Sequence, residues 1–390
     1  MIDFQLTEND EKVLAEIKRQ GLIVREHARY YDEHEDEFPP DSLPEGADLP
    51  NPFSMLGGRD EADTPMGVIV LLMAMAQSWG DYSVRIRNTV GGLGNAALRA
   101  SGTEAQMLRW NDKTLAMAIT EPGCGSDSKA IQTTAVLDGD EWVINGEKIF
   151  VTTGCRADGV VVWATLDKSA GRAGIKSFVI MKQTPGFEVT HKEKKLGIRA
   201  DDTAAMVFKD CRIPRDHLLG GNEEIPKQGS GGFRGVMKTF NMTRPSVAAT
   251  GLGMAMAALD FTREAFADEG IEVDWEQGTN TRSAIAQKLI EIEADIEAAR
   301  LTICHAAWLA GRGEENNVEA SISKAKGGEV ARTATQRCLE LLGAVGITRD
   351  HLVEKWCRDT RITDIYEGTG QIQRLIIARQ ILGYSSAELS

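Results

Sequence analysis

The sequence predicts an α+β protein of several domains: an N-terminal helical domain, a middle antiparallel β domain and a C-terminal four-helix bundle. Three observations lead to this fold class. Apolar residues recur at helical spacing early in the chain, short β-branched runs alternate with turn residues in the middle, and long Ala- and Leu-rich amphipathic segments fill the remainder. At about 150 residues per domain, a chain of 390 residues has room for two or three domains.

The predicted N-terminal helical domain spans residues 1–113. Val13, Ile17 and Val24 fall close to one helical stripe with charged residues between them. Residues 37–63 are rich in Pro, Asp and Gly, which is typical of a long connection. The apolar stretch at residues 66–79 follows, and we expect it to form a buried helix.

The predicted middle domain spans residues 114–224, where the hydrophobic period changes. Short β-branched and aromatic runs, such as residues 142–144 and 159–165, are typical of strands. The turn sequences Asp138-Gly139-Asp140 and Asn145-Gly146 separate three of these runs and are strong hairpin signals. We therefore expect a compact antiparallel sheet or barrel here.

The predicted C-terminal domain spans residues 225–390 and returns to a helical texture. In its second helix, Ile285, Leu289, Ile292 and Ile296 lie close to helical spacing, with acidic residues on the other face. The Thr243-Arg244-Pro245 sequence is expected to begin the first helix. Four long helices suggest a bundle; they are expected at residues 243–267, 281–312, 320–342 and 370–382.

The composition excludes several classes of protein. Lys plus Arg total 44 and Asp plus Glu total 58, a net charge of −14 that argues against nucleic-acid binding. The longest apolar run, Met66 to Ala76, is shorter than the ~20 residues that a membrane span requires. The N-terminus has early acids and no apolar signal core, so we expect a cytoplasmic protein. The six cysteines form no CxxC pair and the histidines show no metal-ligand spacing, so we expect free thiols and no metal site.

Two short sequences in and before the β-rich segment carry groups that suit ligand binding. In Thr120-Glu-Pro-Gly-Cys-Gly-Ser-Asp127, two glycines flank Cys124 and allow close backbone approach, while Thr120 and Ser126 add hydroxyl groups. In residues 148–154 (KIFVTTG), an aromatic residue and two threonines are suited to line a flat ring system. Taken singly, the first is also compatible with a plain turn and the second with an ordinary strand.

The third sequence is Tyr366-Glu-Gly-Thr-Gly-Gln-Ile-Gln-Arg374. Glu367 stands among apolar residues and glycines just before an apolar helix, where partial desolvation should raise its pKa toward that of a general base. Thr369 and Gln371 lie at the expected helix start, where backbone amides suit phosphate or carbonyl oxygens. A helix cap with a solvated glutamate is the alternative interpretation.

Together, and in this order, the three sequences resemble the signatures of the acyl-CoA dehydrogenase family. The family's TEPGxGSD and YEGTxQIQR patterns match residues 120–127 and 366–374, and its TRP pattern matches residues 243–245. The resemblance implies the same three-domain fold, bound FAD, and oxidation of an acyl-CoA thioester to a 2,3-enoyl-CoA. It also implies a tetramer that passes electrons to an electron-transferring flavoprotein.

The resemblance further implies roles for individual residues. Glu367 would be the catalytic base, because Thr243 occupies the position at which other members carry theirs. The thioester oxygen would accept a hydrogen bond from the Glu367 amide and from a ribityl hydroxyl of the flavin. The implied FAD contacts are Met117, Ile119, Thr120, Ser126, Phe150, Thr152, Thr369 and Gln371, with Phe150 in place of the family's Trp. The implied CoA contacts are Ser126, Asn241, Arg244 and Gly368, with Asn241 in place of Asp.

Two departures concern the elements with which a neighbouring subunit completes the FAD site in the family. The RxxFG loop is expected near Glu269, in an acidic stretch without the Arg or the Phe-Gly, and QxxGG is replaced by residues 340–344 (ELLGA). Negative side chains disfavour a diphosphate. The sequence thus allows either a divergent homo-oligomer or a hetero-oligomer with a paralogous subunit, as in steroid-degrading members of the family. A non-catalytic partner subunit and a flavin oxidase on the same fold are the alternative functions, and a cyclic or steroid-derived acyl group is a further expectation.

Overall fold

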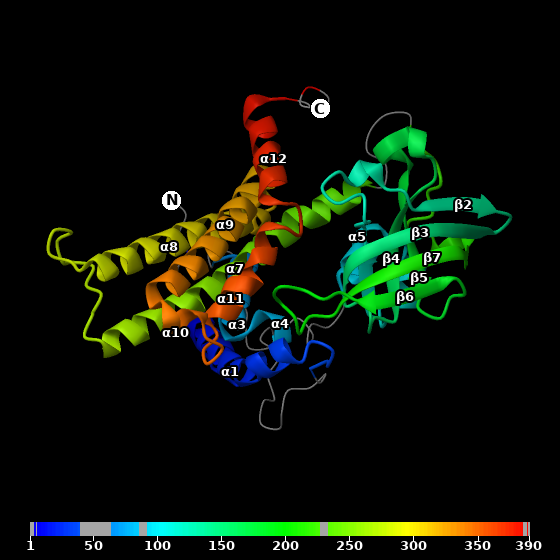
Figure 1. Ribbon diagram of the computed structural model, residues 1–390. Coiled ribbons are helices and arrows are strands. Elements are labelled where there is room, and N and C mark those ends of the chain that lie inside the picture. The colour runs from blue at the N-terminus through cyan, green and yellow to red at the C-terminus, as the bar shows by residue number, and fades with distance from the viewer. Residues whose placement is uncertain are drawn as a thin grey trace.

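The fold consists of a helical body and a twisted β-sheet that lie side by side (Figure 1). The protein is represented by a computed structural model, which describes residues 4, 6–39, 64–85, 92–226, 233–384 and 388. This arrangement of a helical body beside one curled sheet confirms the predicted fold class. Most of the expected connection at residues 37–63 lies outside the described residues.

The N-terminal helices begin with α1 (Glu8–Glu33), whose first turn is closed by a capping box between Thr7 and Asp10. It packs on α3 (Met66–Gly80), the buried helix that the apolar run predicts. A Cβ at Gly80 would lie 2.4 Å from Gly21, so the two helices cross where neither carries a side chain. Three short helices follow: α4 (Tyr82–Arg85), α5 (Leu93–Ser101) and α6 (Glu104–Trp110).

The sheet has seven strands in the order β1-β4-β2-β3-β7-β6, with β5 also paired to β4. Two of the strand pairs, β1–β4 and β2–β4, are parallel, and the others are antiparallel. This corrects the expectation of a purely antiparallel sheet. Strand β4 is buried along its whole length, because one face meets the sheet core and the other meets α5 and its neighbours. The strands are β1 (Leu115–Ala118), β2 (Thr134–Asp138), β3 (Glu141–Thr152), β4 (Gly159–Thr165), β5 (Ile175–Met181), β6 (Phe187–Lys192) and β7 (Thr203–Pro214).

The two predicted hairpin turns have different outcomes. Asp138 pairs with Glu141, so the Asp-Gly-Asp sequence does turn β2 into β3. The turn predicted at Asn145-Gly146 is wrong, because β3 continues through it and forms a bulge against β7. Asn145 accepts a hydrogen bond from the amide of Asp210 at 2.8 Å, and a Cβ on Gly146 would lie 2.4 Å from Thr133. Asn145 and Gly146 therefore form a β-bulge that packs closely against Thr133, and not a hairpin turn.

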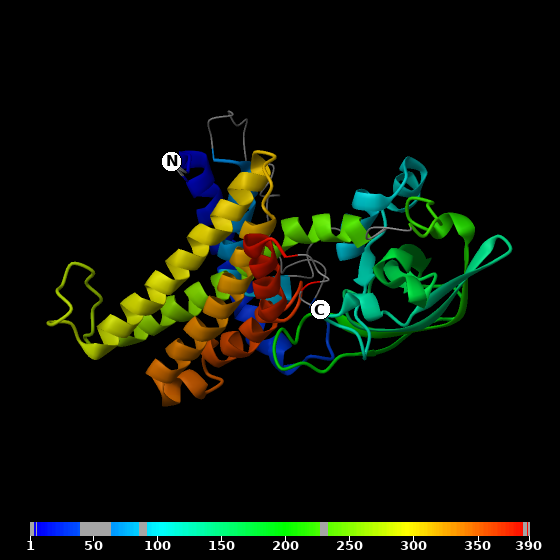
Figure 2. The ribbon, with the colours of Figure 1, turned by 90° about the horizontal axis from the view of Figure 1, so that it is seen from above.

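The C-terminal helices form the bundle, with α7 packed against α3, α8 and α9 (Figures 1 and 2). The first begins earlier than predicted: α7 starts at Phe233, and Pro245 lies inside it. Leu252, Leu289 and Ile303 belong to a core that this bundle shares with α3. The helices are α7 (Phe233–Asp268), α8 (Ala284–Gly311), α9 (Asn317–Leu342), α10 (Ala344–Ile347), α11 (Val353–Asp359) and α12 (Gly370–Leu382).

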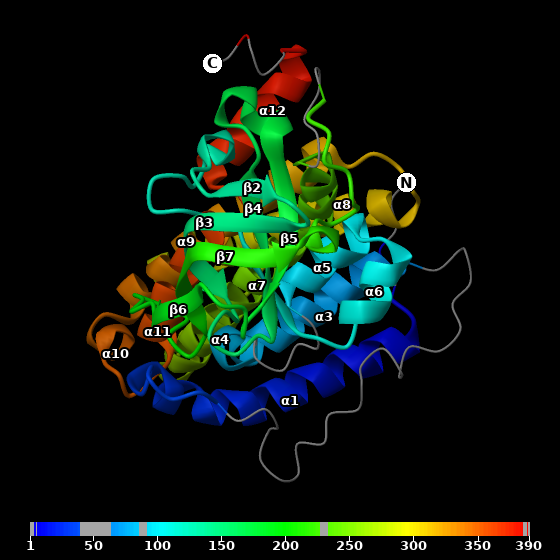
Figure 3. The same cartoon turned by 90° about the vertical axis from the view of Figure 1, so that its right-hand side faces the viewer.

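Helix α12 projects from the bundle, and α1 runs along the opposite side of the molecule (Figure 3). Only Gly370 and Gln373 of α12 are buried, while Ile381 and Leu382 remain exposed. In the described part of the chain, every helix is too short or too polar to cross a membrane.

Candidate active site

A cavity of about 1580 Å³ opens between the sheet and the helices. Its wall combines the residues after β1, the end of β3, the N-terminal half of α7, and the turn that precedes α12. The three sequence motifs, which are distant along the chain, therefore meet at one site. This convergence is the main structural observation about function.

The Thr120–Asp127 motif is held in place by a buried ion pair. The Glu121 carboxylate lies 2.8 Å from Lys148 Nζ, and both side chains are buried. Glu121 also accepts hydrogen bonds from the hydroxyl and amide of Thr133, and Lys148 donates to the carbonyl of Ile119 at 2.9 Å. Burial alone would raise the pKa of Glu121, but Lys148 and these hydrogen bonds hold it below its ordinary value.

This buried pair leaves the remainder of the motif free to face the cavity. Thr120 and Ser126 line it, and a Cβ built on Gly123 or Gly125 would meet no atom within 4 Å. The backbone there is consequently open to close approach by a ligand. Glu121 and Lys148 stand in two of the sequence motifs, but no sequence signal marks them as a pair.

Phe150 stands beside the motif on a second bulge of β3. Its φ of +57° is unusual for a residue with a side chain, and the residue is 58% exposed although its neighbour Val151 is buried. Phe150 and Thr152 both line the cavity. The bulge thus turns an aromatic face toward the cavity, in agreement with the expected wall for a flat ring.

Glu367 occupies the turn before α12 and faces the motif residues across the cavity. Its Oε2 accepts a hydrogen bond from Thr243 Oγ1 at 2.9 Å. The backbone is left-handed at Glu367, with a φ of +56°, and at Gly368, with a φ of +87°. At Gly368 a Cβ would lie 2.4 Å from Gln373 Nε2, so only glycine fits.

The strained turn is fixed by two buried side chains. Lys324 of α9 donates to the carbonyl of Gly368 at 3.1 Å, and Gln373 of α12 donates to the carbonyls of Glu367 and Gly368 at 3.1 and 3.2 Å. Both side chains are fully buried. They compensate for the cost of the left-handed backbone, and strain of this kind is concentrated at functional sites.

The electrostatic surroundings of Glu367 suit a proton acceptor. Burial raises the pKa of Glu367, while the Thr243 hydrogen bond and the positive charges of Arg244 and Lys324 act in the opposite direction. Burial also lowers the pKa of Lys324 to about 8. A carboxylate with a raised pKa, next to an open cavity, is a candidate general base.

The structure brings together most of the predicted site residues. Gln371 and Thr369 are not among the cavity-lining residues; the Thr369 hydroxyl instead accepts from the amide of Ile372 as the N-cap of α12. The Asn241 side chain lies outside the described residues. The predicted residues that line the cavity are Met117, Ile119, Thr120, Ser126, Phe150, Thr152, Arg244, Glu367 and Gly368.

Several cavity residues had no signal in the sequence. Asp201 and Lys195 come from the connection between β6 and β7, and Tyr82 comes from the short helix α4. No motif or spacing marks them, because they reach the cavity only through tertiary folding. Among the described residues, no group of three or more His, Cys, Asp or Glu side chains gathers to hold a metal ion.

Comparison with known proteins agrees with the motifs. Residues 116–211 match the family model for the middle domain of acyl-CoA dehydrogenases, and residues 230–382 match the model for the C-terminal domain. The short-chain specific acyl-CoA dehydrogenase of Clostridium acetobutylicum is 34% identical over 97% of this chain and 100% of its own length. The mitochondrial short-chain specific enzyme of Bos taurus is 38% identical over 72% of this chain and 67% of its own length.

Among solved structures, the fold is similar to that of butyryl-CoA dehydrogenase from Megasphaera elsdenii. The TM-score is 0.79 at 29% identity, and the match covers 98% of this chain and 100% of that one. The similarity therefore extends through the N-terminal helices, which the two domain models do not include.

Proposed function

The chain belongs to the acyl-CoA dehydrogenase family, and we propose from this membership that it oxidises an acyl-CoA thioester to the 2,3-enoyl-CoA. The observation that carries the proposal is the position of Glu367, whose carboxylate faces the motif residues across one cavity. The relatives named above act on short acyl chains according to their names, which supports an acyl-CoA substrate.

Family members depend on FAD, and the cavity residues fit that cofactor. The open backbone at Gly125 and the hydroxyls of Thr120 and Ser126 suit polar edges and phosphates, and the exposed Phe150 suits a flat heterocycle. When bound there, FAD supplies the acceptor for the hydride that leaves the β-carbon. Met117, Ile119 and Thr152 complete the set of residues that we propose hold it.

The proposed catalytic step is proton abstraction by Glu367. The hydrogen on the carbon next to a thioester is weakly acidic, so the base must be close and partly desolvated. Thr243 orients Oε2 of Glu367, while Lys324 and Gln373 fix its backbone. The amide of Glu367 is proposed to donate to the thioester oxygen as negative charge develops there. Arg244, Gly368, Ser126 and Asn241 are proposed to bind the CoA moiety.

We propose that the protein is a cytoplasmic oligomer. The family implies an electron-transferring flavoprotein as its electron acceptor. Helix α12 supports oligomerisation, because Ile381 and Leu382 leave an apolar surface at the end of a projecting helix. The connection between α7 and α8, which contains Glu269, lies at the end of the bundle away from the sheet (Figures 1 and 2). The resemblance to the family implies that this element completes the cofactor site of a neighbouring subunit, and here it is acidic. We therefore propose a hetero-oligomer with a paralogous subunit.

The substitution Glu367→Gln tests the function. It keeps the shape of the side chain and removes the base, so turnover with acyl-CoA should fall by roughly three orders of magnitude or more while FAD content stays unchanged. Glu329→Gln is the matched control, since this glutamate pairs with Arg374 outside the cavity and should retain activity. Equal turnover of the Glu367→Gln and wild-type proteins would contradict the proposal and favour an assembly subunit.

A further inference from the structure

One part of the cavity wall is unusually polar for a site that accepts an acyl chain. Tyr82, Thr250, Tyr366, Asp201 and Lys195 all line the cavity and come from α4, α7, the turn before α12, and the connection between β6 and β7. The hydroxyls of Tyr82 and Tyr366 are hydrogen-bonded at 2.9 Å. We refer to these five residues as the polar wall.

Within the polar wall, the carboxylate of Asp201 has an oxygen that lacks a hydrogen-bond partner among the described residues. Its side chain is only 2% exposed, and its Oδ2 accepts a hydrogen bond from Thr203 Oγ1 at 3.0 Å. Its Oδ1 is buried and has no hydrogen-bond partner in the described structure. Lys195 donates to the backbone carbonyl of Asp201 at 2.7 Å, which leaves Oδ1 unsatisfied. A buried carboxylate oxygen without a partner is costly, so it indicates a donor that a ligand supplies.

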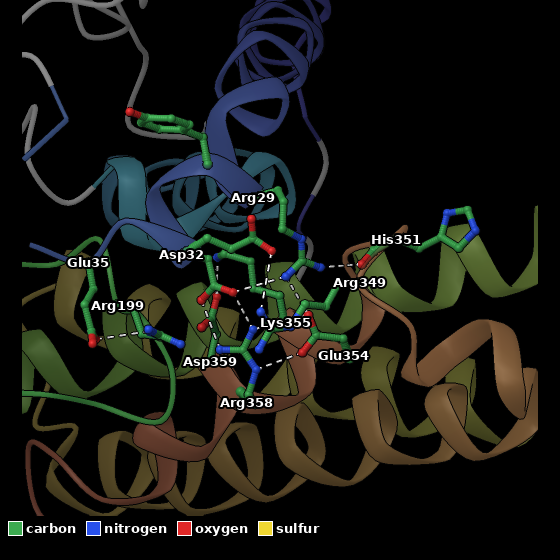
Figure 4. A network of polar contacts seen from close by, with 12 residues as sticks. Arg29, Asp32, Glu35, Arg199, Arg349, His351, Glu354, Lys355, Arg358 and Asp359 are labelled. Atoms are coloured by element: carbon green, nitrogen blue, oxygen red, sulfur yellow. Dashed lines mark hydrogen bonds and ion pairs between the residues drawn. The ribbon is translucent and has the colours of Figure 1, made fainter. Parts of the chain in front are cut away.

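The backbone that carries Asp201 is held by a buried ionic network (Figure 4). The amide of Ile198, a residue with the strained φ of +44°, donates to Asp359 Oδ1 at 2.5 Å, and the amide of Asp201 donates to the carbonyl of Ile198 at 2.9 Å. Asp359 also pairs with the fully buried Lys355 at 2.6 Å. Arg358 donates to the carbonyl of Leu196 at 2.9 Å.

The same network holds Tyr82. Lys355 Nζ lies 2.6 Å from Asp81 as well, and Asp81 caps α4 by accepting from the amide of Val84 at 2.8 Å. One buried lysine therefore fixes both the helix that presents Tyr82 and the connection that presents Asp201. Such rigidity is characteristic of a prepared binding site, because the orientation of the polar groups is fixed before a ligand arrives.

We infer that the polar wall recognises a hydroxyl group carried by the acyl chain, at a distance from the thioester. This inference rests on the proposed function and specifies its substrate class. The hydroxyl would donate to Asp201 Oδ1 and accept from a tyrosine hydroxyl or from Lys195. The opposite charges of Asp201 and Lys195 offset each other, so a neutral polar group suits the wall better than a charged one.

Burial raises the pKa of Asp201 to about 6, against the opposing effects of Lys195 and Thr203. At neutral pH the carboxylate is therefore ionised. A hydrogen bond to an ionised acceptor is stronger than one to a neutral acceptor, so it favours a hydroxylated acyl chain over its deoxy counterpart more strongly. Burial also raises the pKa of both tyrosines, so their hydroxyls stay protonated and available for hydrogen bonding.

The test compares acyl-CoAs that end in a hydroxyl with their deoxy counterparts, for chains of four to ten carbons. At the chain length that reaches the polar wall, kcat/KM for the hydroxylated substrate should exceed that of its counterpart roughly tenfold or more. The substitution Asp201→Ala should abolish this ratio, and Tyr82→Phe should reduce it. Asp295→Ala, on α8 and outside the cavity, is the control that should leave the ratio unchanged.

Binding provides a readout that is independent of turnover. Dissociation constants of the same pairs, measured by calorimetry on Glu367→Gln protein with FAD added in excess, should show the same preference and the same loss in the Asp201→Ala background. A ratio near one at every chain length, or a preference that Asp201→Ala leaves intact, would overturn the inference. If no acyl-CoA is oxidised but the binding preference is observed, the proposed function is wrong and the recognition of a hydroxyl group by the polar wall is supported.

Discussion

At the scale of single residues, the hydrogen bond from Thr243 to Glu367 influences the pKa of the proposed catalytic base. The two residues are far apart in the chain, yet the hydroxyl of Thr243 donates to the carboxylate of Glu367 at 2.9 Å. A donor of this kind favours the ionised form of a carboxylate. Thr243 therefore offsets part of the rise in pKa that burial imposes on Glu367.

The substitution Thr243→Val should raise the pKa of Glu367 further, because it removes that donor and keeps the shape of the side chain. Glu367 acts as a base only when ionised, so the acidic limb of the pH–kcat profile should move to higher pH, by about one unit. Thr243→Ser keeps the hydroxyl and is the matched control. An unchanged profile in the valine variant would show that Thr243 does not tune the base.

Among the elements, α11 joins the helical body to the cavity wall through Lys355. This lysine is completely buried and lies 2.6 Å from both Asp81 and Asp359. Although burial alone would lower it, the two aspartates raise the pKa of Lys355 above its ordinary value. The lysine thus remains charged inside the protein.

We expect Lys355→Met to lower the free energy of unfolding by about 3–5 kcal/mol, because it leaves two buried carboxylates without their cation. Urea denaturation of the wild-type and variant chains, purified in the same way, measures this difference. Lys12→Met removes the exposed ion pair with Glu8 and should change stability by less than about 1 kcal/mol. Similar midpoints for the two variants would contradict the structural role of Lys355.

Helix α9 contributes Lys324, whose charge should be visible in the pH dependence of stability. Its pKa is about 8 in the folded protein against 10.5 ordinarily. Between these values the unfolded chain binds a proton that the native state does not, so this lysine makes stability rise with pH. Relative to that of Lys324→Met, the free energy of unfolding of the wild type should increase by on the order of 3 kcal/mol from pH 8 to pH 10.5.

The control for that comparison is Lys326→Met, an exposed lysine on the same helix. Its difference from the wild type should stay constant over the same pH range. If the free energies of unfolding of Lys324→Met and the wild type change in parallel with pH, the pKa of Lys324 is not lowered in the folded protein.

At the scale of the whole molecule, the described chain supplies one side of the proposed cofactor site. The described cavity residues supply the base, the hydroxyls and the aromatic wall. Residues 267–273 are acidic, and residues 340–344 carry one glutamate, Glu340. They stand where the resemblance to the family implies basic or neutral patterns that complete this site from a neighbouring subunit.

We therefore expect the chain expressed alone to fold with much less than one FAD per chain. Flavin absorbance together with native mass spectrometry gives the ratio and the oligomeric state. Co-expression with a paralogous subunit should raise the ratio toward one FAD per pair. One FAD per chain in the protein purified alone would contradict the hetero-oligomer.

The sequence by itself determined the fold class, the family and the residues that form the motifs. Helical periodicity and short β-branched runs are local signals, and Glu367, Thr120 and Ser126 stand in motifs that are recognisable along the chain. Two predictions from the sequence were wrong. The turn at Asn145-Gly146 is a bulge, because Gly146 packs closely against Thr133. Helix α7 begins before Thr243, because it continues through Pro245. Both features depend on the surrounding structure.

Only the tertiary structure decided which further residues share the cavity. Asp201, Tyr82 and Lys324 belong to no motif, and they reach Glu367 and its surroundings because separate elements pack together. The physical reason is that burial and pairing, which set the pKa of Glu367 and leave Asp201 Oδ1 without a partner, are properties of spatial neighbours and not of adjacent residues.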